Sequence, residues 1–575
     1  YPSRFARSSW IVRPPATWAW PPRHHRLRGS YHQHSTAQHG GRANNPEPPS
    51  PEPRLNRSPS DATKRKENTI PATPLTLIAV IDGLRPAALN ALDTPFLSQL
   101  ADEGFTYDHA VAAFPALTRA NAATLATGHH PGHTGIFGNR VWHHELGHID
   151  TADVEDVRRL RDVGAMPQAT IAERLSRLGH STVVIGNGSA GCTYLLNPGS
   201  DAGHGARIAS VAPDREVYRS VPPNVMTGLE GLGPRPASDD EALEWAVAAG
   251  VVSITTNAPD LLIFCSGQPD TAHHHTGLTS AASTEALRRV DQAVRTLHAA
   301  VLDTGRECNL ILTADHGFCA TIESLELTET LNEIADRAGP PPNGFVPTFN
   351  GGVVFGYFEP GTALPLRASV ASRIVEQPWA GPVFCADAYC PADAFPLSPA
   401  VGGDSPFTPD LIITMRADPA DQAGPTDPPA RALHARASGT QAYSGVHGTV
   451  HPADMRIPLI LHGPAFKPRT RCALPAGPAD IAATAYKLVT GALLDDADGR
   501  VLTESLHDGG PALPAVERRI DRGDASVTLS HIEDRCYLLG GVSRQQDLNQ
   551  RHGLEDQDRA MNTASGRPTN SGNEE

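Results

Sequence analysis

The amino-acid sequence predicts an α/β fold, with a mostly parallel central sheet, helices on both faces and an inserted α+β subdomain. Short apolar runs of strand length alternate with amphipathic stretches of helix length along most of the chain. Asp82, Asp270 and Asp315 each come after a predicted strand, and functional groups of such sheets collect at the carboxyl ends of the strands. A loss of this alternation after about residue 335 predicts the insertion.

Each element of the predicted core rests on its own pattern of apolar residues. The predicted strands are continuous apolar runs at 75–81, 181–185, 260–264, 309–312 and 457–461. The predicted helices carry apolar residues at helical spacing and lie at 94–103, 121–127, 169–178, 240–252, 284–302 and 479–490. Helices between successive strands favour parallel pairing, because a parallel connection needs a crossover.

Residues 335–440 depart from this alternation and are rich in Pro and Gly, with strands expected at 349–357 and 410–415. We therefore expect a core formed by residues 71–334 and 441–510, an inserted α+β subdomain or cap at 335–440, and a C-terminal extension at 511–575 with a disordered tail. Residues 1–70 are rich in Pro, Arg, Ser and His without a sustained period, which predicts a disordered leader.

Composition and charge exclude several classes of protein. No apolar run approaches the roughly 18 residues that cross a bilayer, so we expect no membrane span. Residues 1–66 contain 12 Lys/Arg against 3 Asp/Glu, a net charge of +9, although the whole chain carries −15, so the remainder carries −24. An acidic globular part disfavours nucleic acid as a stable partner, although bound metal ions would still attract an anionic substrate. Residues 1–70 show no apolar segment typical of a secretory signal, which favours a cytoplasmic protein.

Seven residues in five short windows form a suitable ligand set for two metal ions. They are Asp82, Thr118, Asp270, His274, Asp315, His316 and His447. Three carboxylates, three imidazoles and one hydroxyl suit two zinc-like ions with an alcohol nucleophile between them. None of the eight cysteines forms a C-x-x-C pair, so a zinc site built on cysteine is not expected. The set predicts hydrolysis of a phosphoryl ester or a close analogue.

Some of these residues also have ordinary structural interpretations. Asp82 after a strand is typical of a turn or a helix cap, and Thr118 is typical of a helix N-cap. Asp315 and His316 directly follow an apolar strand, and two adjacent polar groups at that place are hard to explain without a function. The two histidines that flank His274 are expected to be exposed or to support a ligand rather than to bind metal.

At these windows the chain resembles the alkaline phosphatase superfamily and, within it, the type I phosphodiesterase/nucleotide pyrophosphatase family. The resemblance covers roughly residues 74–510. The matching segments are Val80-Ile81-Asp82-Gly83, Thr118-Arg119-Ala120-Asn121, Thr127-Gly128-His129-His130-Pro131, the run from His133 to Asn139, Pro269-Asp270 with His274, Asp315-His316-Gly317 and His447-Gly448. It implies an alkaline-phosphatase-like core and the activity of a phosphoric ester hydrolase.

The resemblance also implies a role for each residue. One divalent metal ion, zinc or manganese, would be held by Asp270, His274 and His447, and a second by Asp82, Asp315 and His316. Thr118 would be the nucleophile, and Asn139 would donate a hydrogen bond to a phosphoryl oxygen. A threonine hydroxyl is a poor nucleophile at neutral pH unless metal coordination lowers its pKa. In-line attack would then give a phospho-threonine that water hydrolyses.

Arg119 departs from the pattern of nucleotide-cleaving members, which place an aromatic residue directly after the nucleophile to stack on a base. An arginine here would bind an anionic group of the substrate or pair with a surface acid. Arg85 is a second candidate for holding the extra charge of a phosphomonoester.

Nucleotide specificity is therefore left open, and the expected partner is a small-molecule phosphate ester or phosphonate. Phosphomonoesterase and phosphonoacetate-hydrolase-like activities are alternatives, although the lysines expected near a substrate carboxylate are absent from 185–188 and 272–275. A catalytically inactive, metal-containing binding protein is a further alternative.

Overall fold

The structure is a computed structural model that describes residues 73–212, 216–233, 236, 238–339, 344–418 and 429–543. The chain divides into two units, Tyr1–Asn68 and Thr69–Glu575, and every described residue belongs to the second. The predicted leader and the predicted disordered tail lie outside the described residues. Within the described ranges, no helix combines the length and the apolar character that crossing a membrane requires.

A nine-stranded sheet forms the centre of the described structure. Its strands, in spatial order, are β19 (Thr470–Ala476), β2 (Phe105–Ala110), β18 (Leu459–His462), β9 (Cys308–Thr313), β1 (Leu75–Ile81), β8 (Leu261–Ser266), β5 (Thr182–Gly186), β6 (Ala206–Ala209) and β7 (Tyr218–Arg219). Neighbouring strands are parallel, except that β18 runs antiparallel to β2 and β9, and β7 runs antiparallel to β6. The prediction of a mostly parallel sheet is therefore confirmed.

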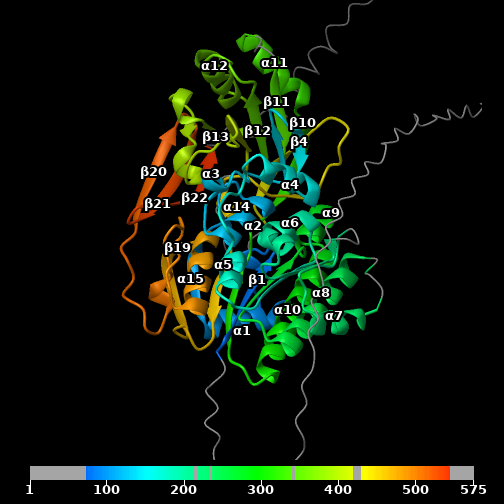
Figure 1. The fold of residues 1–575 in the computed structure, drawn as a ribbon. Helices are drawn as coiled ribbons and strands as arrows, with labels where there is room; N and C mark the ends of the chain where they lie inside the picture. The colour runs from blue at the N-terminus through cyan, green and yellow to red at the C-terminus, as the bar shows by residue number, and fades with distance from the viewer. Residues whose placement is uncertain are drawn as a thin grey trace, which may run out of the picture. The chain divides into compact units, whose positions relative to one another are not determined.

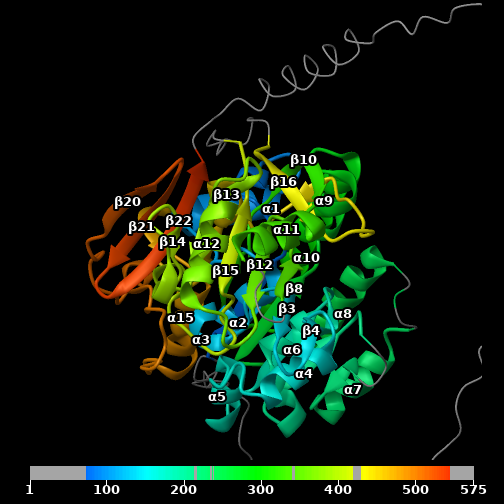
Figure 2. The same ribbon diagram turned by 90° about the horizontal axis from the view of Figure 1, so that it is seen from above.

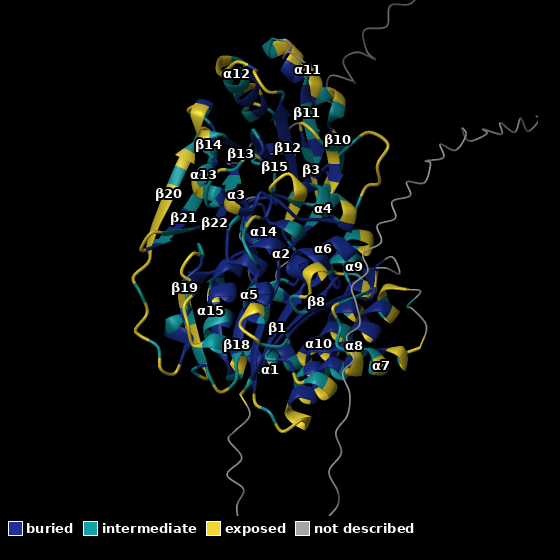
Figure 3. Cartoon of the chain, in the orientation of Figure 1, coloured by how far each residue is buried: buried dark blue, intermediate teal, exposed yellow. Residues whose placement is uncertain are grey.

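Helices cover both faces of this sheet (Figure 1). One group consists of α1 (Pro95–Glu103), α8 (Asp239–Asn257) and α10 (Ala281–Asp303), and the other of α2 (Thr118–Thr127), α5 (Ile171–Arg177), α6 (Ala190–Leu196) and α15 (Pro478–Thr490). Because they are covered on both sides, β1, β8 and β9 are buried at every residue (Figure 3). That double burial is the reason that these strands are continuous apolar runs in the sequence.

A second sheet has its own apolar cluster and lies beneath two helices (Figure 2). Its strands are β11 (Phe345–Phe349), β12 (Val353–Phe358), β15 (Leu411–Met415), β13 (Ala380–Cys385) and β14 (Phe395–Pro396), and its helices are α11 (Thr328–Ala338) and α12 (Leu364–Val375). The strand predicted at 349–357 is confirmed over residues 353–357, which belong to β12, but its predicted start is wrong, because residue 349 ends β11. Gly351 has a φ of +76°, which suits a glycine, and the chain turns there so that β11 and β12 pair antiparallel. The limits of the inserted subdomain stay a prediction.

Two three-stranded sheets and the two-stranded sheet of β3 (Arg140–His143) and β4 (Gly147–Asp150) complete the described fold. The first consists of β10 (Cys319–Glu326), which pairs in parallel with β16 (Arg431–Arg436) and antiparallel with β17 (Gly445–Val446). The second consists of β20 (Val516–Arg522), β21 (Ala525–Ile532) and β22 (Arg535–Ser543), in a segment where the sequence analysis expected no strands. The shorter elements are η1 (Pro86–Ala88), α3 (Pro131–Thr134), β3 (Arg140–His143), β4 (Gly147–Asp150), α4 (Val154–Asp162), η2 (Pro198–Ala202), α7 (Pro223–Glu230), α9 (Asp270–Thr276), η4 (Asp387–Tyr389), α13 (Ser398–Val401), α14 (Pro452–Met455) and η5 (Thr503–Ser505).

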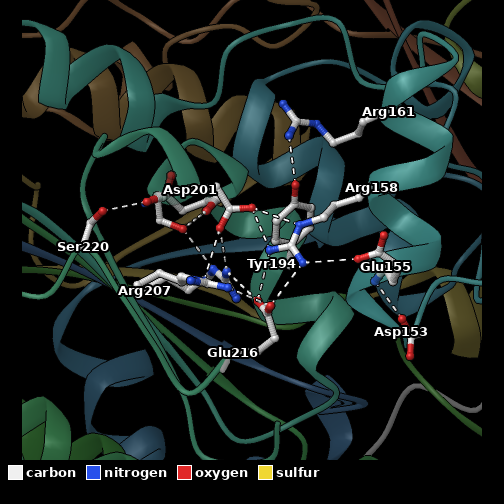
Figure 4. Close-up of polar contacts among 12 residues, drawn as sticks. Asp153, Glu155, Arg158, Arg161, Tyr194, Asp201, Arg207, Glu216 and Ser220 are labelled. Atoms are coloured by element: carbon white, nitrogen blue, oxygen red, sulfur yellow. Dashed lines mark hydrogen bonds and ion pairs between the residues drawn. The ribbon is translucent and has the colours of Figure 1, made fainter. Parts of the chain in front are cut away.

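A buried charge network ties α4 to the outer strands of the central sheet (Figure 4). Arg207 on β6 is fully buried, and its Nη2 lies 3.2 Å from Glu216 and 3.3 Å from Asp201. Arg158 on α4 bonds the same two carboxylates, at 3.1 Å and 2.7 Å, and Arg219 bonds Glu216 at 2.9 Å. Burial alone would raise the pKa of Glu216, but the hydrogen bonds from the three arginines outweigh it and hold the pKa at about 2.

Glu216→Gln should destabilise the protein and change its response to acid. A carboxyl whose pKa falls from 4.5 to about 2 on folding stabilises the folded state above about pH 4.5, and the contribution disappears as the pH falls toward 2. The free energy of unfolding at pH 7, measured by urea denaturation, should therefore fall by about 3 kcal/mol, with less than half of that difference at pH 3.

Glu155→Gln is the matched control, because Glu155 pairs with the same Arg158 but is exposed. Exposed pairs contribute about 1 kcal/mol or less. Equal losses from the two substitutions would show that the buried network does not contribute as described.

Candidate active site

The candidate ligands lie where strands of the central sheet and of the β10 sheet end. Asp82 directly follows β1, Asp270 begins α9 shortly after β8, and Asp315 comes two residues after β9. Strand β1 pairs in parallel with both β8 and β9, so the carboxyl ends of the three strands meet at one edge of the sheet. His447 directly follows β17, whose partner β10 begins three residues after His316.

Thr118 is the first residue of α2. The sequence pattern predicts that this helix begins at residue 121, and the predicted start is wrong by three residues. The N-cap position belongs to Leu117, so the interpretation of Thr118 as the N-cap is also excluded. The side chain of Thr118 is buried, and its Oγ1 lies 3.2 Å from Nε2 of His316. The hydroxyl therefore faces the candidate ligands.

The ligand atoms converge on two overlapping clusters. Nε2 of His316 lies 3.2 Å from Oδ1 of Asp82, 3.7 Å from Oδ2 of Asp315 and 4.0 Å from Oδ1 of Asp270. The same Asp270 oxygen lies 3.4 Å from Nε2 of His274 and 3.6 Å from Nε2 of His447. One ligand atom from each of Asp82, Asp315 and His316 lies within 4.8 Å of the others, and the same holds for Asp270, His316 and His447.

The three histidines are oriented in the same way, by the main chain. Nδ1 donates to a backbone carbonyl in each: His274 to Gly445 at 2.9 Å, His316 to Gly317 at 2.9 Å and His447 to Ala116 at 3.0 Å. A carbonyl oxygen only accepts, so Nδ1 carries a proton in each of the three rings. Nε2, the other ring nitrogen, therefore faces the carboxylates and is the atom through which each imidazole would bind a metal ion.

Three buried carboxylate oxygens lack a hydrogen-bond donor among the described residues: Oδ1 of Asp82, Oδ1 of Asp270 and Oδ2 of Asp315. Burial raises the pKa of Asp270 to about 6, and burial together with the charge of Asp82 raises the pKa of Asp315 to about 7. His316 responds in the opposite way, because the charges of Asp315 and Asp82 outweigh its burial and raise its pKa to about 10. Unpaired buried carboxylates are costly unless cations neutralise them, so the residues fit divalent metal ions.

Asn139 and Arg119 line the cavity in front of these clusters. The backbone N–H of Arg119 donates to Oδ1 of Asn139 at 3.5 Å, which orients the amide and leaves its NH₂ group for another acceptor. Nη2 of Arg119 donates to Oγ of Ser189 at 2.8 Å. Among the described residues, Arg119 has no carboxylate partner, although its charge lies close enough to the clusters to lower the pKa of Asp82 and Asp270.

The cavity has a volume of about 400 Å³, and its walls come from different parts of the chain. Asp270, His274 and His447 form the side toward the ligands. The other side is formed by residues that the sequence analysis did not single out, namely Asn350, Gly351, His434, Arg436 and Tyr443. No local motif marks these residues, because tertiary folding alone brings them to the site.

The remaining residues considered from the sequence, Arg85 and the two histidines that flank His274, differ in their positions. Arg85 is half-buried and does not line the cavity, so it is not placed to hold a substrate phosphate there. His275 is exposed and lies on the cavity wall, whereas His273 is fully buried with its ring against Phe318.

Comparison with known proteins identifies the family. The family model described as type I phosphodiesterase/nucleotide pyrophosphatase matches residues 76–373. The chain belongs to this family. Membership confirms the family resemblance that the sequence motifs predict.

The sequence match to an individual member of the type I phosphodiesterase/nucleotide pyrophosphatase family is short. Ectonucleotide pyrophosphatase/phosphodiesterase 1 of Saccharomyces cerevisiae is 35% identical over 82 residues, which are 13% of this chain and 11% of the yeast protein. The matched segment thus spans about a tenth of that relative's length.

Solved structures show the same fold at low identity. An inactive variant of murine ectonucleotide pyrophosphatase/phosphodiesterase 5, in complex with AMP, has a TM-score of 0.50 and 17% identity, covering 73% of this chain and 96% of its own. Phosphonoacetate hydrolase from Sinorhizobium meliloti, in complex with phosphonoformate, has a TM-score of 0.53 and 16% identity, with the same coverage of both chains. At these identities the likeness shows the fold alone.

Divalent metal should stabilise the protein through the unpaired carboxylates. Zinc added to chelator-treated protein should raise the free energy of unfolding by about 2.7 kcal/mol at a metal concentration 100 times Kd. Asp315→Asn removes one buried carboxylate and should lower both the bound metal, measured by mass spectrometry, and the stabilisation, measured by thermal unfolding. The exposed Asp508→Asn is the control; unchanged metal content in Asp315→Asn would contradict the ligand assignment.

Proposed function

We propose that the protein hydrolyses small-molecule phosphodiesters or pyrophosphates, with Thr118 as the nucleophile and two divalent metal ions as cofactors. The observation that carries this proposal is the position of the Thr118 hydroxyl. It lies against His316, where the two ligand clusters overlap, on a protein whose family hydrolyses phosphoric esters.

The ligand set divides between two ions. Asp270, His274 and His447 would hold one ion, and Asp82, Asp315 and His316 the other, with zinc suited to the mixed set and manganese also accommodated. When bound, such ions supply positive charge that lowers the pKa of the threonine hydroxyl and stabilises the entering and leaving oxygens.

Thr118 carries out the covalent step. Its hydroxyl gives up a proton to solvent and its oxygen forms a bond to phosphorus as the bond between phosphorus and the leaving oxygen breaks, and the alcohol or phosphate that leaves takes up a proton from solvent. Water then attacks the phospho-threonine, which releases the second product and restores the hydroxyl. Because Thr118 is the first residue of α2, a phosphoryl group on its oxygen would lie at the N-terminus of this helix, where the helix dipole favours negative charge.

Asn139 and Arg119 act on the substrate rather than on the nucleophile. The NH₂ group of Asn139, whose Oδ1 is already occupied by the N–H of Arg119, donates to a phosphoryl oxygen. Arg119 offers a charge without a carboxylate partner among the described residues, beside the nucleophile. It suits a substrate with a second anionic group, such as a pyrophosphate, and it is also the observation that favours a phosphomonoester or phosphonate as the second candidate.

Thr118→Ala should abolish turnover without loss of metal. Hydrolysis of bis-p-nitrophenyl phosphate should fall by about 10³-fold or more, because the covalent route is lost while the ligand set is intact. Thr118→Ser retains a hydroxyl and is the matched variant, which should keep measurable activity that a chelator removes. Turnover of Thr118→Ala equal to that of Thr118→Ser would remove this residue from the role of nucleophile.

Arg119→Ala should discriminate between substrates by charge. Loss of a hydrogen-bonded charge pair should lower kcat/KM for p-nitrophenyl phosphate, which carries one more negative charge, about 10- to 100-fold more than for bis-p-nitrophenyl phosphate. Arg177→Ala, an exposed arginine on α5, is the control. An unchanged ratio of the two substrates would place Arg119 outside the substrate's reach.

A further inference from the structure

The cavity wall that faces the ligand clusters carries a serine–histidine pair. His434 lies on β16 and Ser324 on β10, and the two residues are paired in the register of these strands. Oγ of Ser324 is 2.8 Å from Nδ1 of His434. Strand β10 begins three residues after His316, and β17, its other neighbour, leads directly to His447. The position of this pair relative to the ligand clusters is therefore fixed by main-chain hydrogen bonds.

His434 is a neutral polar group that faces the cavity rather than the apolar core. Its side chain is nearly buried but lines the cavity. Burial, followed by the charges of His274 and Arg436, lowers its pKa to about 4, so the ring is neutral at pH 7. With Nδ1 bonded to Ser324, Nε2 is the nitrogen that remains for a ligand.

Tyr443 provides a flat face between this histidine and the ligand clusters. Its ring centroid lies 5.1 Å from that of His274 and 5.6 Å from that of His434. The loop that carries Tyr443 is held by Arg436, which donates to the carbonyl of Thr440 at 2.8 Å. An aromatic face followed by a neutral hydrogen-bonding ring suits a planar group with a polar edge.

The direction of the reaction decides which half of the substrate meets this wall. In-line displacement requires the nucleophile and the leaving oxygen on opposite sides of phosphorus. Thr118 lies against His316, whereas His274 lies on the side of Asp270 and His447, and Tyr443 packs next to His274. The group that leaves is therefore directed toward Tyr443 and His434.

We propose that Tyr443 and His434 form the leaving-group subsite, and that it selects a flat ring bearing a hydrogen-bond acceptor. Ser324 is the positioning residue: its hydroxyl donates to Nδ1 and so places the ring proton on Nε2, from which His434 donates to the acceptor on the leaving group. This inference rests on the proposed function, because it assumes attack by Thr118.

Two aryl methyl phosphates with leaving phenols of matched acidity test the selectivity, one 4-nitrophenyl and one polychlorophenyl. The nitro group accepts a hydrogen bond, and the chlorine substituents do so poorly. His434→Ala should lower the ratio of kcat/KM for the nitrophenyl ester to that for the chlorophenyl ester about 10-fold, the effect of one hydrogen bond. Ser324→Ala should lower it in the same direction, and His434→Gln, which keeps a donor, should restore part of it.

His507→Ala is the matched control, since His507 is exposed and does not line the cavity. It should leave the ratio as in the unmodified protein. An equal loss on both esters in His434→Ala would indicate a merely structural role and overturn the proposal, as would a rise in the ratio.

Binding to Thr118→Ala protein separates this inference from the proposed function. Calorimetry with 4-nitrobenzylphosphonate and a polychlorobenzylphosphonate should show a preference for the former that His434→Ala removes, while Tyr443→Leu should weaken both relative to methylphosphonate. Metal-loaded protein that hydrolyses neither ester would overturn the proposed function, and the binding preference would then still decide the subsite. Equal weakening of both arylphosphonates by His434→Ala would overturn the proposed leaving-group subsite.

Discussion

The mutual repulsion of three buried carboxylates is the constraint around which the site is organised. Asp82, Asp270 and Asp315 follow three adjacent parallel strands, and the pairing of β1 with β8 and β9 holds their side chains together. One oxygen of each carboxylate lacks a hydrogen-bond donor among the described residues, and the pKa of His316 is raised because the carboxylates surround it. The apolar packing of the sheet on both faces is what opposes this repulsion and keeps the three groups in place.

The two walls of the cavity come from different parts of the chain. The side of the candidate ligands follows strands β8 and β17, and the facing wall comes from the turn after β11, from β16 and from the loop before β17. Substitutions on the facing wall can alter the shape of the cavity without moving a candidate metal ligand. Such a division is a common way for one fold to serve different substrates.

Much of the core, and the convergence of the candidate ligands at one edge of the sheet, could be predicted, because each depends on a short segment. The apolar run before Asp315 and His316 predicts a buried strand, and these two residues mark the polar groups at its end. The facing wall could not be predicted, since His434 and Tyr443 are brought to the site by pairing between distant strands. The break between β11 and β12 carries an Asn350-Gly351 turn signal that the prediction of a single strand did not use, whereas the charged side chains of β20 give no strand pattern.

The anchoring of the three histidines to main-chain carbonyls has a consequence for how the site can change over evolutionary time. Where a carboxylate side chain orients a ligating imidazole, a single substitution releases the ring. Here Gly445, Gly317 and Ala116 contribute backbone oxygens, which are present whatever residue occupies the position. Substitutions of neighbouring side chains therefore leave the orientation of the imidazoles unchanged as long as the path of the backbone is kept.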